Sequence, residues 1–223
     1  MRRSARARRA RIQVTADGVE VVVPRGLALA EVEPFVASKR VWIERTLLRM
    51  RAAEAARPRP LLADGGTVPH LGETLELAVR VEPARRRSHV ARRGDTLAVA
   101  VAEGGEEAVA DALERWYRAR ARVEVAARLD AAVARVGRAY ASLQIRGQRS
   151  RWASCSARSG MSFNWRLLLA PAEILDYVVE HEVAHLDVRD HSPRFWALLA
   201  QRCPAAREHE AWLRANGHTL RLR

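Results

Sequence analysis

The feature that most constrains this chain is the segment VVEHEVAHLDVRDH, residues 178–191, in which histidines and acids stand among apolar residues. His181 and His185 are four residues apart, and in an α-helix such side chains lie on one face, about one turn apart. Two imidazoles at this spacing can bind one ion. Zinc accepts neutral imidazole nitrogen and, in catalytic sites, combines three protein ligands with a water. The segment therefore predicts a helix that carries two ligands of one metal ion.

Glu182 directly follows the first of these histidines. This offset places its carboxylate beside the ion rather than among the ligands, where it can take a proton from a metal-bound water. The motif H-E-x-x-H thus describes a mechanism as well as a pattern. The surrounding residues are apolar, as at Ile174, Val178 and Val183. A buried helix would bear two histidines and a glutamate only at a high cost unless these groups were paired or metal-bound.

His191 lies six residues after His185, just before a new helix. A chain reversal there would bring it back to the ion as third ligand. The spacing equals that of the metzincins, but Val188 stands at their glycine position, and a β-branched residue resists the positive φ of their turn. One alternative remains open: His191 only enters the next helix, and Asp190 or a water is the next ligand. We expect Asp187 and Asp190 to be solvated or to orient an imidazole.

Composition places the chain among globular proteins. It has 223 residues, of which 48% are hydrophobic and 29% charged. No apolar run reaches the roughly 18 residues that a membrane span needs, so we expect no membrane partner. The basic N-terminus has no apolar segment behind it, unlike a secretory signal. The two cysteines, Cys155 and Cys203, indicate no disulfide framework. We therefore expect a cytoplasmic location.

The formal net charge of +13 raises the question of nucleic-acid binding. Lys39 is the only lysine, so the excess of arginine and alanine is typical of a compositional bias over the whole chain. The densest charge cluster is the N-terminus, with six arginines in the first eleven residues, and such a tail is usually just solvated. A nucleotide or nucleic-acid partner remains possible on these grounds.

Periodicity predicts an α+β fold. Alternating segments predict a hairpin at 11–24 around Asp17-Gly18 and strands at 66–83 and 95–102, and a helical pattern covers 29–56. A second helix is expected at 106–136, followed by three short strands within 142–169 and by helices that begin near Pro171, Ser192-Pro193 and Pro204. Gly217 is expected as a left-handed helix cap. We divide the chain into a basic tail at 1–10, a β-rich N-terminal region at 11–103 with one or two helices, and a catalytic region at 104–223.

Residues 149–217, with the segments RWASCS, SFNWRLLL and HEVAHLDVRDH, resemble the YgjP-like metallopeptidase family and are similar to the zinc core of SprT-like proteases. The front half shows a weaker resemblance to the same family. The resemblance implies a zincin-like catalytic region, in which a small sheet packs on the active-site helix. It implies zinc (Zn²⁺) as cofactor, with His181, His185 and His191 as ligands and Glu182 as general base. It also implies that RWASCS and the strand with Asn164 flank the cleft.

These observations favour a zinc-dependent metallohydrolase, and the resemblance makes a peptide or protein the leading substrate, attacked at its carbonyl by water that Glu182 activates. One alternative is a metal-dependent nucleotide pyrophosphatase, because arginines at 146, 149, 151 and 166 would suit a phosphate. Another is a basic nucleic-acid-associated protein with a structural zinc, although such a site would need a fourth ligand. Candidate substrate-binding residues are Asn164, Arg151 and Tyr177. Arg151 would equally suit a role in steadying the sheet, and a helical tyrosine is more often part of the core.

Overall fold

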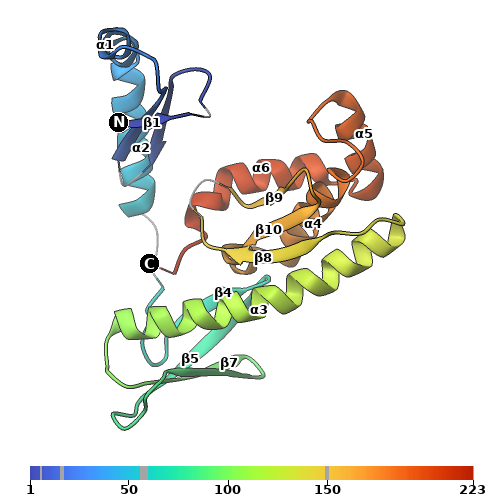
Figure 1. Cartoon of the computed structure of the whole chain (residues 1–223). Helices are drawn as coiled ribbons and strands as arrows, with labels where there is room; N and C mark the ends of the chain where they lie inside the picture. The colour runs from blue at the N-terminus through green and yellow to red at the C-terminus, as the bar shows by residue number, and fades with distance from the viewer. Residues whose placement is uncertain (6, 16–17, 56–59, 149–150, 223) are drawn as a thin grey trace. The chain divides into compact units, whose positions relative to one another are not determined.

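A computed structural model describes residues 1–5, 7–15, 18–55, 60–148 and 151–222 of the chain. The chain divides into two compact units, Met1–Pro58 and Arg59–Arg223, and each has its own sheet and helices (Figure 1). Helices and sheets occur together in both units, so the expected α+β class is confirmed. Within the described ranges, no helix combines the length and the apolar character that crossing a membrane requires.

The first unit is a three-stranded sheet with two helices. Its strand order is β1-β3-β2, with β1 parallel and β2 antiparallel to β3. Val22 and Val23 of β3 and Val32 of the first helix are buried and form the small core. The elements are β1 (Arg2–Ser4), β2 (Arg11–Thr15), β3 (Gly18–Pro24), α1 (Leu29–Ser38) and α2 (Arg40–Ala55).

The N-terminal segment was expected to be a solvated tail, but its residues 2–4 form a strand. Arg2 is held by an ion pair with Glu20 at 2.9 Å, and Arg3 donates to the backbone carbonyls of Arg25 and Leu27. These bonds align the chain end with β3, which periodicity alone does not reveal. The expected hairpin strands at 11–24 are present, while residues 16 and 17 of its turn lie outside the described residues.

The second unit begins with a four-stranded sheet of order β4-β5-β7-β6, in which β5 and β7 are parallel. Its first two strands are joined by Leu71 and Gly72, with φ of 52° and 91°. Two consecutive positive φ values characterise the tight turn whose twist suits a hairpin, and glycine adopts them without strain. The strands are β4 (Thr67–His70), β5 (Glu73–Val81), β6 (His89–Arg93) and β7 (Thr96–Val101).

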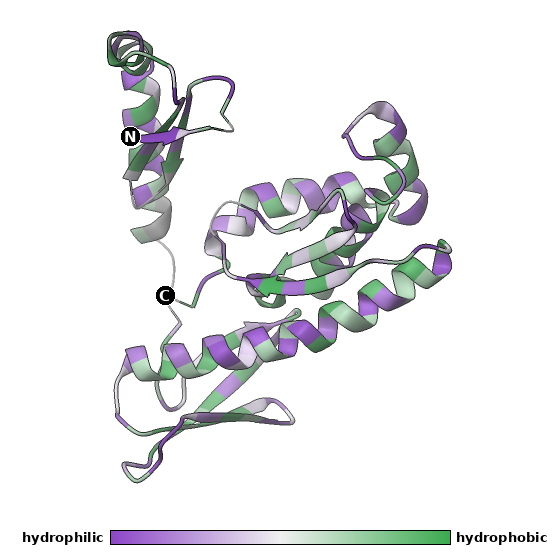
Figure 2. Cartoon of the chain, in the orientation of Figure 1, coloured by the Kyte–Doolittle hydropathy of each residue, from purple (hydrophilic) through white to green (hydrophobic). Residues whose placement is uncertain are grey.

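The helix α3 (Glu106–Arg135) is 30 residues long and contacts both halves of this unit (Figure 1). Buried side chains recur along it every four residues, and in Figure 2 its colour alternates between hydrophobic and hydrophilic. The Tyr117 hydroxyl donates to the carbonyl of Pro69 in β4, and its ring lies 5.8 Å from that of Trp165. One helix thus joins the four-stranded sheet to the elements that follow.

The remainder of the unit is a three-stranded sheet covered by helices. Its order is β8-β10-β9, with β8 parallel and β9 antiparallel to β10. The last of the expected strands is shorter than predicted, because it ends at Asn164 rather than at 169. The Asn164 side chain accepts a hydrogen bond from Arg166 N, and a 3-10 helix begins there. The elements are β8 (Ser142–Arg146), β9 (Ala153–Cys155), β10 (Gly160–Asn164), η1 (Trp165–Leu169), α4 (Ala172–Ala184), α5 (Pro193–Arg202), α6 (Ala206–Asn216) and η2 (Gly217–Thr219).

Two further expectations differ from the structure. Gly217 has φ −56° rather than a left-handed conformation, because the chain continues into η2 instead of reversing after α6. The boundary that we placed between 103 and 104 falls inside the second unit, because α3 contacts β6 and β7 as well as the later elements. The elements β1–β3, α1 and α2 therefore form the separate unit, and β4–β7 belong with the elements that carry His181, His185 and His191.

Candidate metal centre

The helix α4 presents His181 and His185 from its last turn. Most of its residues are buried, because it contacts α3, α5, α6 and β9. His185 is the C-cap but keeps helical dihedrals, φ −68° and ψ −12°. The expected one-turn relation between the two histidines therefore holds, and their ring centroids lie 5.0 Å apart.

His191 returns to this pair after a short loop. Its Nε2 lies 3.0 Å from Nε2 of His181, and its ring centroid is 4.7 Å from that of His185. The three histidines each offer a nitrogen atom, and these atoms lie within 4.8 Å of one another. The structure thus brings together the three residues expected as ligands. Positive φ values outside glycine occur, among the described residues, at Leu71 and Ser159, so the loop makes its turn without one at Val188.

The chemistry of these donors fits a metal ion. Two ligands of a tetrahedral ion at zinc–nitrogen bond lengths stand about 3.3 Å apart, close to the separation of the His181 and His191 nitrogens. His185 Nδ1 lies 3.0 Å from the Val188 carbonyl, which can only accept. The proton must therefore sit on Nδ1 of His185, and the Nε2 lone pair is left for a ligand.

The surroundings of His181 and His185 favour the neutral imidazole, the form that metal ligation requires. Burial, followed by the charges of His185 and His191, lowers the pKa of His181 to about 3. Burial is also the main cause that lowers the pKa of His185. His181 Nδ1 is buried without a hydrogen-bond partner within the described part of the chain.

Glu182 lies beside the histidines but makes a different set of contacts. Its side chain is buried, and burial raises the pKa of its carboxyl to about 7, although a hydrogen bond from the Cys155 backbone opposes this shift. Its Oε2 has no hydrogen-bond partner among the described residues. The carboxyl thus has one oxygen held by β9 and one available, and near neutral pH it can both accept and release a proton.

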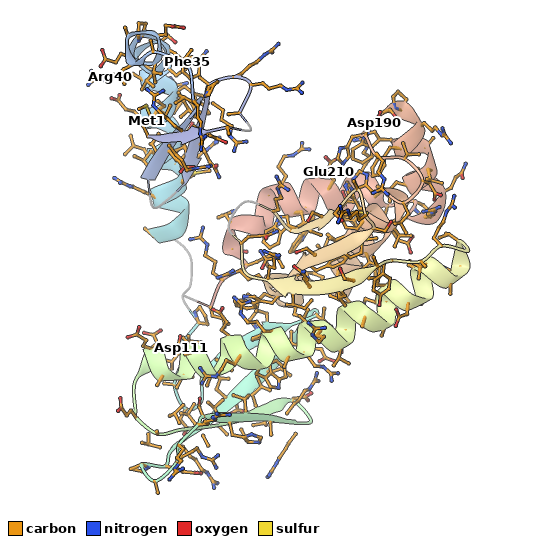
Figure 3. All side chains as sticks on the ribbon, in the orientation of Figure 1. Met1, Phe35, Arg40, Asp111, Asp190 and Glu210 are labelled. Atoms are coloured by element: carbon orange, nitrogen blue, oxygen red, sulfur yellow. The ribbon has the colours of Figure 1, made fainter. Side chains whose placement is uncertain are left out.

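The loop that carries His191 is fastened at several points. Asp187 pairs with Arg138 at 2.6 Å and with Arg202 at 2.7 Å. Arg189 donates to the carbonyl of Ser156 at 2.7 Å and also reaches Cys155 Sγ. Asp190, labelled in Figure 3, accepts from Ser192 N at the start of α5. The expected possibility that Asp187 is solvated is therefore wrong, since it is an internal ion-pair partner.

Aromatic rings enclose the histidine cluster on the side of α5. Phe195 stacks on His185 with centroids 4.6 Å apart, and Trp196 lies 6.1 Å from His191. Arg207 covers the Trp196 ring at 3.5 Å. These rings cover the imidazoles on the side that faces α5.

The three candidate substrate-binding residues have different surroundings. Asn164 is 3% exposed, donates to the carbonyls of Gln148 and Arg151 and accepts from Arg166 N. Both of its amide hydrogens are therefore committed to the backbone, so it stabilises the turn and is poorly placed to bind substrate. Arg151 is exposed on the segment before β9. Tyr177 is buried and lies edge-on to His181 at 5.9 Å, as a core residue next to the cluster would.

Sequence reasoning missed the backbone of Cys155 and the side chain of Arg138 as parts of the site. A backbone N–H carries no sequence signal, and nothing in the pattern distinguishes Arg138 from the many other arginines. The resemblance that placed RWASCS beside the cleft was the one signal that pointed to this segment, but it did not single out the Cys155 backbone.

An α+β unit with a cluster of three imidazoles and an adjacent buried carboxylate is an arrangement typical of metal-dependent hydrolases. A family model described as YgjP-like, metallopeptidase domain, matches residues 8–216 of the chain. The chain belongs to the YgjP-like family, as the sequence resemblance led us to expect.

Among solved structures, the chain is similar to the crystal structure of the metallopeptidase zymogen of Pyrococcus abyssi abylysin. The two share 25% sequence identity over 44% of this chain and 96% of that chain, with a TM-score of 0.38. No curated protein matches the chain.

Proposed function

We propose that this chain is a zinc-dependent metallopeptidase whose catalytic groups lie in the unit Arg59–Arg223. The observation that carries the proposal is the arrangement at the end of α4. Three imidazoles offer nitrogens within 4.8 Å of one another, and the available Oε2 of Glu182 belongs to the residue next to the first of them. Because His185 and Glu182 are buried, their polar groups cost free energy unless a ligand compensates them.

Zinc is the proposed ion because it prefers neutral imidazole nitrogen and is held in catalytic sites by three protein ligands. His181, His185 and His191 would hold it. A bound zinc ion supplies Lewis acidity, which lowers the pKa of a water molecule and polarises a carbonyl group. The Val188 carbonyl and the ring of Phe195 fix the orientation of His185, so that its free nitrogen is preorganised.

Glu182 is the proposed general base and acid. Its carboxylate takes the proton from the water that attacks the peptide carbonyl, and it then delivers that proton to the leaving nitrogen as the C–N bond breaks. The hydrogen bond from the Cys155 backbone keeps one carboxyl oxygen in place while the other faces the reaction. Arg151 remains a candidate for substrate binding because its side chain is exposed close to β9.

A nucleotide pyrophosphatase finds less support in the same region. The Arg146 guanidinium donates to Gln144, and Arg166 donates to the Gly147 carbonyl and stacks on Trp165 at 4.6 Å. These bonds are internal and stabilise the sheet. Arg149 lies outside the described residues. A structural zinc site would be closed by four protein ligands, whereas the cluster contains three histidines.

The decisive test of the mechanism is Glu182→Gln, which keeps the size of the side chain and removes its basicity. We expect normal zinc content by elemental analysis and a loss of peptide hydrolysis of at least about 100-fold, the usual contribution of general base catalysis. Glu173→Gln is the matched control, because Glu173 is exposed in the first turn of the same helix. Full hydrolysis by Glu182→Gln would refute the role of this residue.

The metal ligands are tested by His185→Ala, which should lower the zinc content, with exposed His89→Ala as control. Unchanged zinc in His185→Ala would contradict the ligand assignment. The wild-type chain should then be incubated with casein, a peptide library and nucleoside triphosphates. Release of peptides alone supports the proposal, and release of pyrophosphate alone would replace it with the nucleotide reaction.

We also propose that the chain acts in the cytoplasm. Cys155 and Cys203 are both free thiols in the structure, which suits a reducing compartment. Fractionation of cells that produce the chain, followed by immunodetection, tests this location. Recovery from a secreted fraction would contradict it.

A further inference from the structure

Positive charge is concentrated in the first unit. Residues 1–58 contain thirteen basic and six acidic residues, a formal net charge of +7. Residues 59–223 contain twenty-six basic and twenty acidic residues, a charge of +6 over a chain almost three times as long. A compositional bias of the whole chain would raise the charge of both units in proportion to length, so it does not explain this difference.

A hollow of about 560 Å³ lies on the surface of this unit, between β2, α1 and α2. We call it the Trp42 hollow. Figure 3 labels Phe35, one of its lining residues, among the side chains of the two helices. Its lining combines apolar and aromatic side chains with two cations: Ile12, Phe35, Ser38, Lys39, Val41, Trp42 and Arg45.

Trp42 is an exposed aromatic ring between two cations. It is 50% exposed, and its neighbour Val41 is 68% exposed. Lys39 and Arg45 lie three residues before and after it, and the Ile43 N–H bonds to the Lys39 carbonyl, so helical spacing extends over all three positions. Residues three apart on a helix are surface neighbours. Within the described part of the unit, neither cation is paired with an acid, in contrast to Arg40, which pairs with Glu44.

We propose that the first unit binds single-stranded nucleic acid, with a base stacked on Trp42 in this hollow and phosphates on Lys39 and Arg45. Proteins that bind single strands combine a cationic groove with aromatic rings on which bases stack. Both features occur here in one place. A duplex would offer only its backbone to an exposed indole, whereas an unpaired base can lie flat against it. The inference does not depend on the peptidase proposal, because none of these residues belongs to the metal centre.

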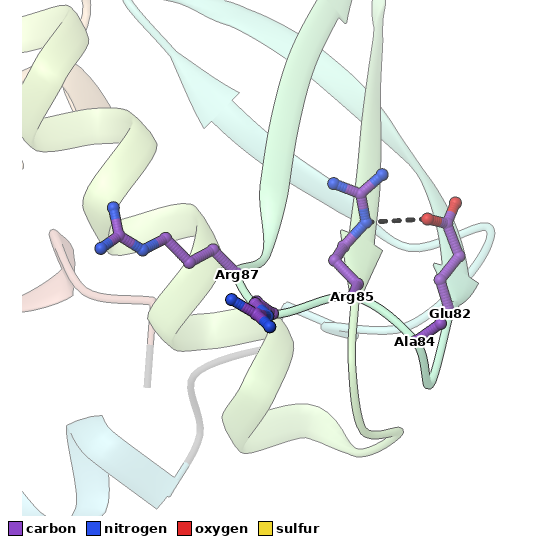
Figure 4. A pocket seen from close by; sticks show the side chains of 5 residues that line it. Glu82, Ala84, Arg85 and Arg87 are labelled. Carbon is purple, nitrogen blue, oxygen red and sulfur yellow. Dashed lines mark hydrogen bonds and ion pairs between the residues drawn. The ribbon is translucent and has the colours of Figure 1, made fainter.

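The second unit has an arginine-rich hollow of its own, which serves as a comparison. It is formed by Glu82, Ala84, Arg85, Arg86 and Arg87 in the loop between β5 and β6 (Figure 4). Arg85 is paired with Glu82 at 2.7 Å, and no aromatic residue is part of the lining. This hollow has charge without a stacking surface, so it provides the matched control.

The test is fluorescence anisotropy of the full chain with labelled twenty-nucleotide single strands of DNA and RNA. With phosphate contacts at Lys39 and Arg45, raising the salt from about 50 to about 200 mM should weaken binding roughly 7-fold, because each contact contributes about 0.7 to the logarithmic salt slope. Trp42→Ala should weaken binding by about 5- to 150-fold at an unchanged slope. Lys39→Gln combined with Arg45→Gln should lower the slope by about 1.4. Trp42→Phe should retain most of the affinity.

The controls decide whether the effect is specific. Arg86→Gln with Arg87→Gln should leave affinity unchanged, and Glu182→Gln should bind as the wild type does, which separates this inference from the proposed catalysis. Binding of either DNA or RNA supports the inference. It is overturned by absence of binding at about 50 mM salt, by an equal loss in the Arg86/Arg87 variant, or by a Trp42→Ala variant, folded by circular dichroism, that binds normally. Trp42-dependent binding to phosphatidylserine vesicles without oligonucleotide binding would also overturn it. If Trp42→Ala is unfolded, the salt slope of the Lys39/Arg45 variant tests the inference instead, and a slope equal to that of the wild type would overturn it.

Discussion

Asp187 should control how tightly the centre holds its metal, although it is not itself a proposed ligand. It stands between His185 and His191 in the loop and pairs with Arg138 on one side and Arg202 on the other. Burial alone would raise the pKa of its carboxyl, but the hydrogen bonds and charges of Arg202 and Arg138 outweigh burial and lower that pKa. Asp187→Ala therefore releases the loop from the end of α3 and from α5.

The expected magnitude follows from what the loop positions. The carbonyl of Val188, the next residue, holds the His185 ring, and His191 lies at the end of the same loop. Loss of such outer contacts usually weakens metal binding about 10- to 100-fold, or about 1.4 to 2.7 kcal/mol. Arg202 is 15% exposed, so the unpaired charge should also lower the free energy of unfolding. We expect a loss of about 1 to 3 kcal/mol, less than for a fully buried pair, because Arg138 is 54% exposed and screened by water.

Zinc affinity can be measured by competition with a chromophoric chelator, and stability by urea unfolding of the metal-free protein. Asp176→Ala is the matched control, because Asp176 also joins α4 to α3, through Arg128 at 2.7 Å, but lies far along the helix from the loop. Asp187→Asn should have an intermediate effect, since the amide keeps one acceptor. Wild-type zinc affinity in Asp187→Ala, or an equal loss in Asp176→Ala, would refute the reasoning.

Three further predictions concern stability and are read from denaturant titrations. Leu113→Ala should lower the free energy of unfolding by about 2–5 kcal/mol, because Leu113 is fully buried in α3, and exposed Val123→Ala should change it little. Gly66→Ala should destabilise the second unit, because the added Cβ would lie 1.7 Å from the carbonyl oxygen of Leu61; an unchanged transition would contradict the backbone described there. Burial, together with the charge of Arg92, lowers the pKa of His70. On acidification, His70 therefore binds a proton more readily in the unfolded chain than in the folded chain. Stability should therefore fall as the pH drops below about 6.5, by up to about 1.4 kcal/mol per pH unit from this group, and His70→Gln should remove that part of the slope.

The metal centre was predictable to the extent that it depends on local helix geometry. A spacing of four residues fixes the relation of His181 to His185 whatever surrounds the helix. The position of His191 depends on a loop, and the loop depends on Arg138, which is nearly fifty residues away in the chain. No periodic pattern encodes such a contact, so the sequence indicated His191 as a ligand but could not give the reason for its placement.

The fold shows the same division between local and distant causes. The apolar pattern of α3 predicted a long helix, yet Val123, one of the apolar residues in that pattern, is 57% exposed. The buried positions follow a strict spacing of four residues, from Leu113 through Tyr117, Ala121 and Val125 to Leu129, and position 123 lies off that line. The boundary near residue 104 was drawn where the strand-rich pattern gives way to a helical pattern, whereas the compact units of the structure divide after Pro58, because α3 contacts both β6 and β7 and the later elements.

The long helix α3 also determines how the second unit can be dissected. A fragment that began near residue 104 would keep every proposed catalytic residue but would expose the face of α3 that β4–β7 cover. It would also lose the Pro69 carbonyl that Tyr117 binds and the hydrogen bond from Leu71 N to Leu168 O. The smallest fragment that folds with all proposed catalytic residues should therefore start near residue 59. It should unfold in a single cooperative transition, because α3 packs against both sheets.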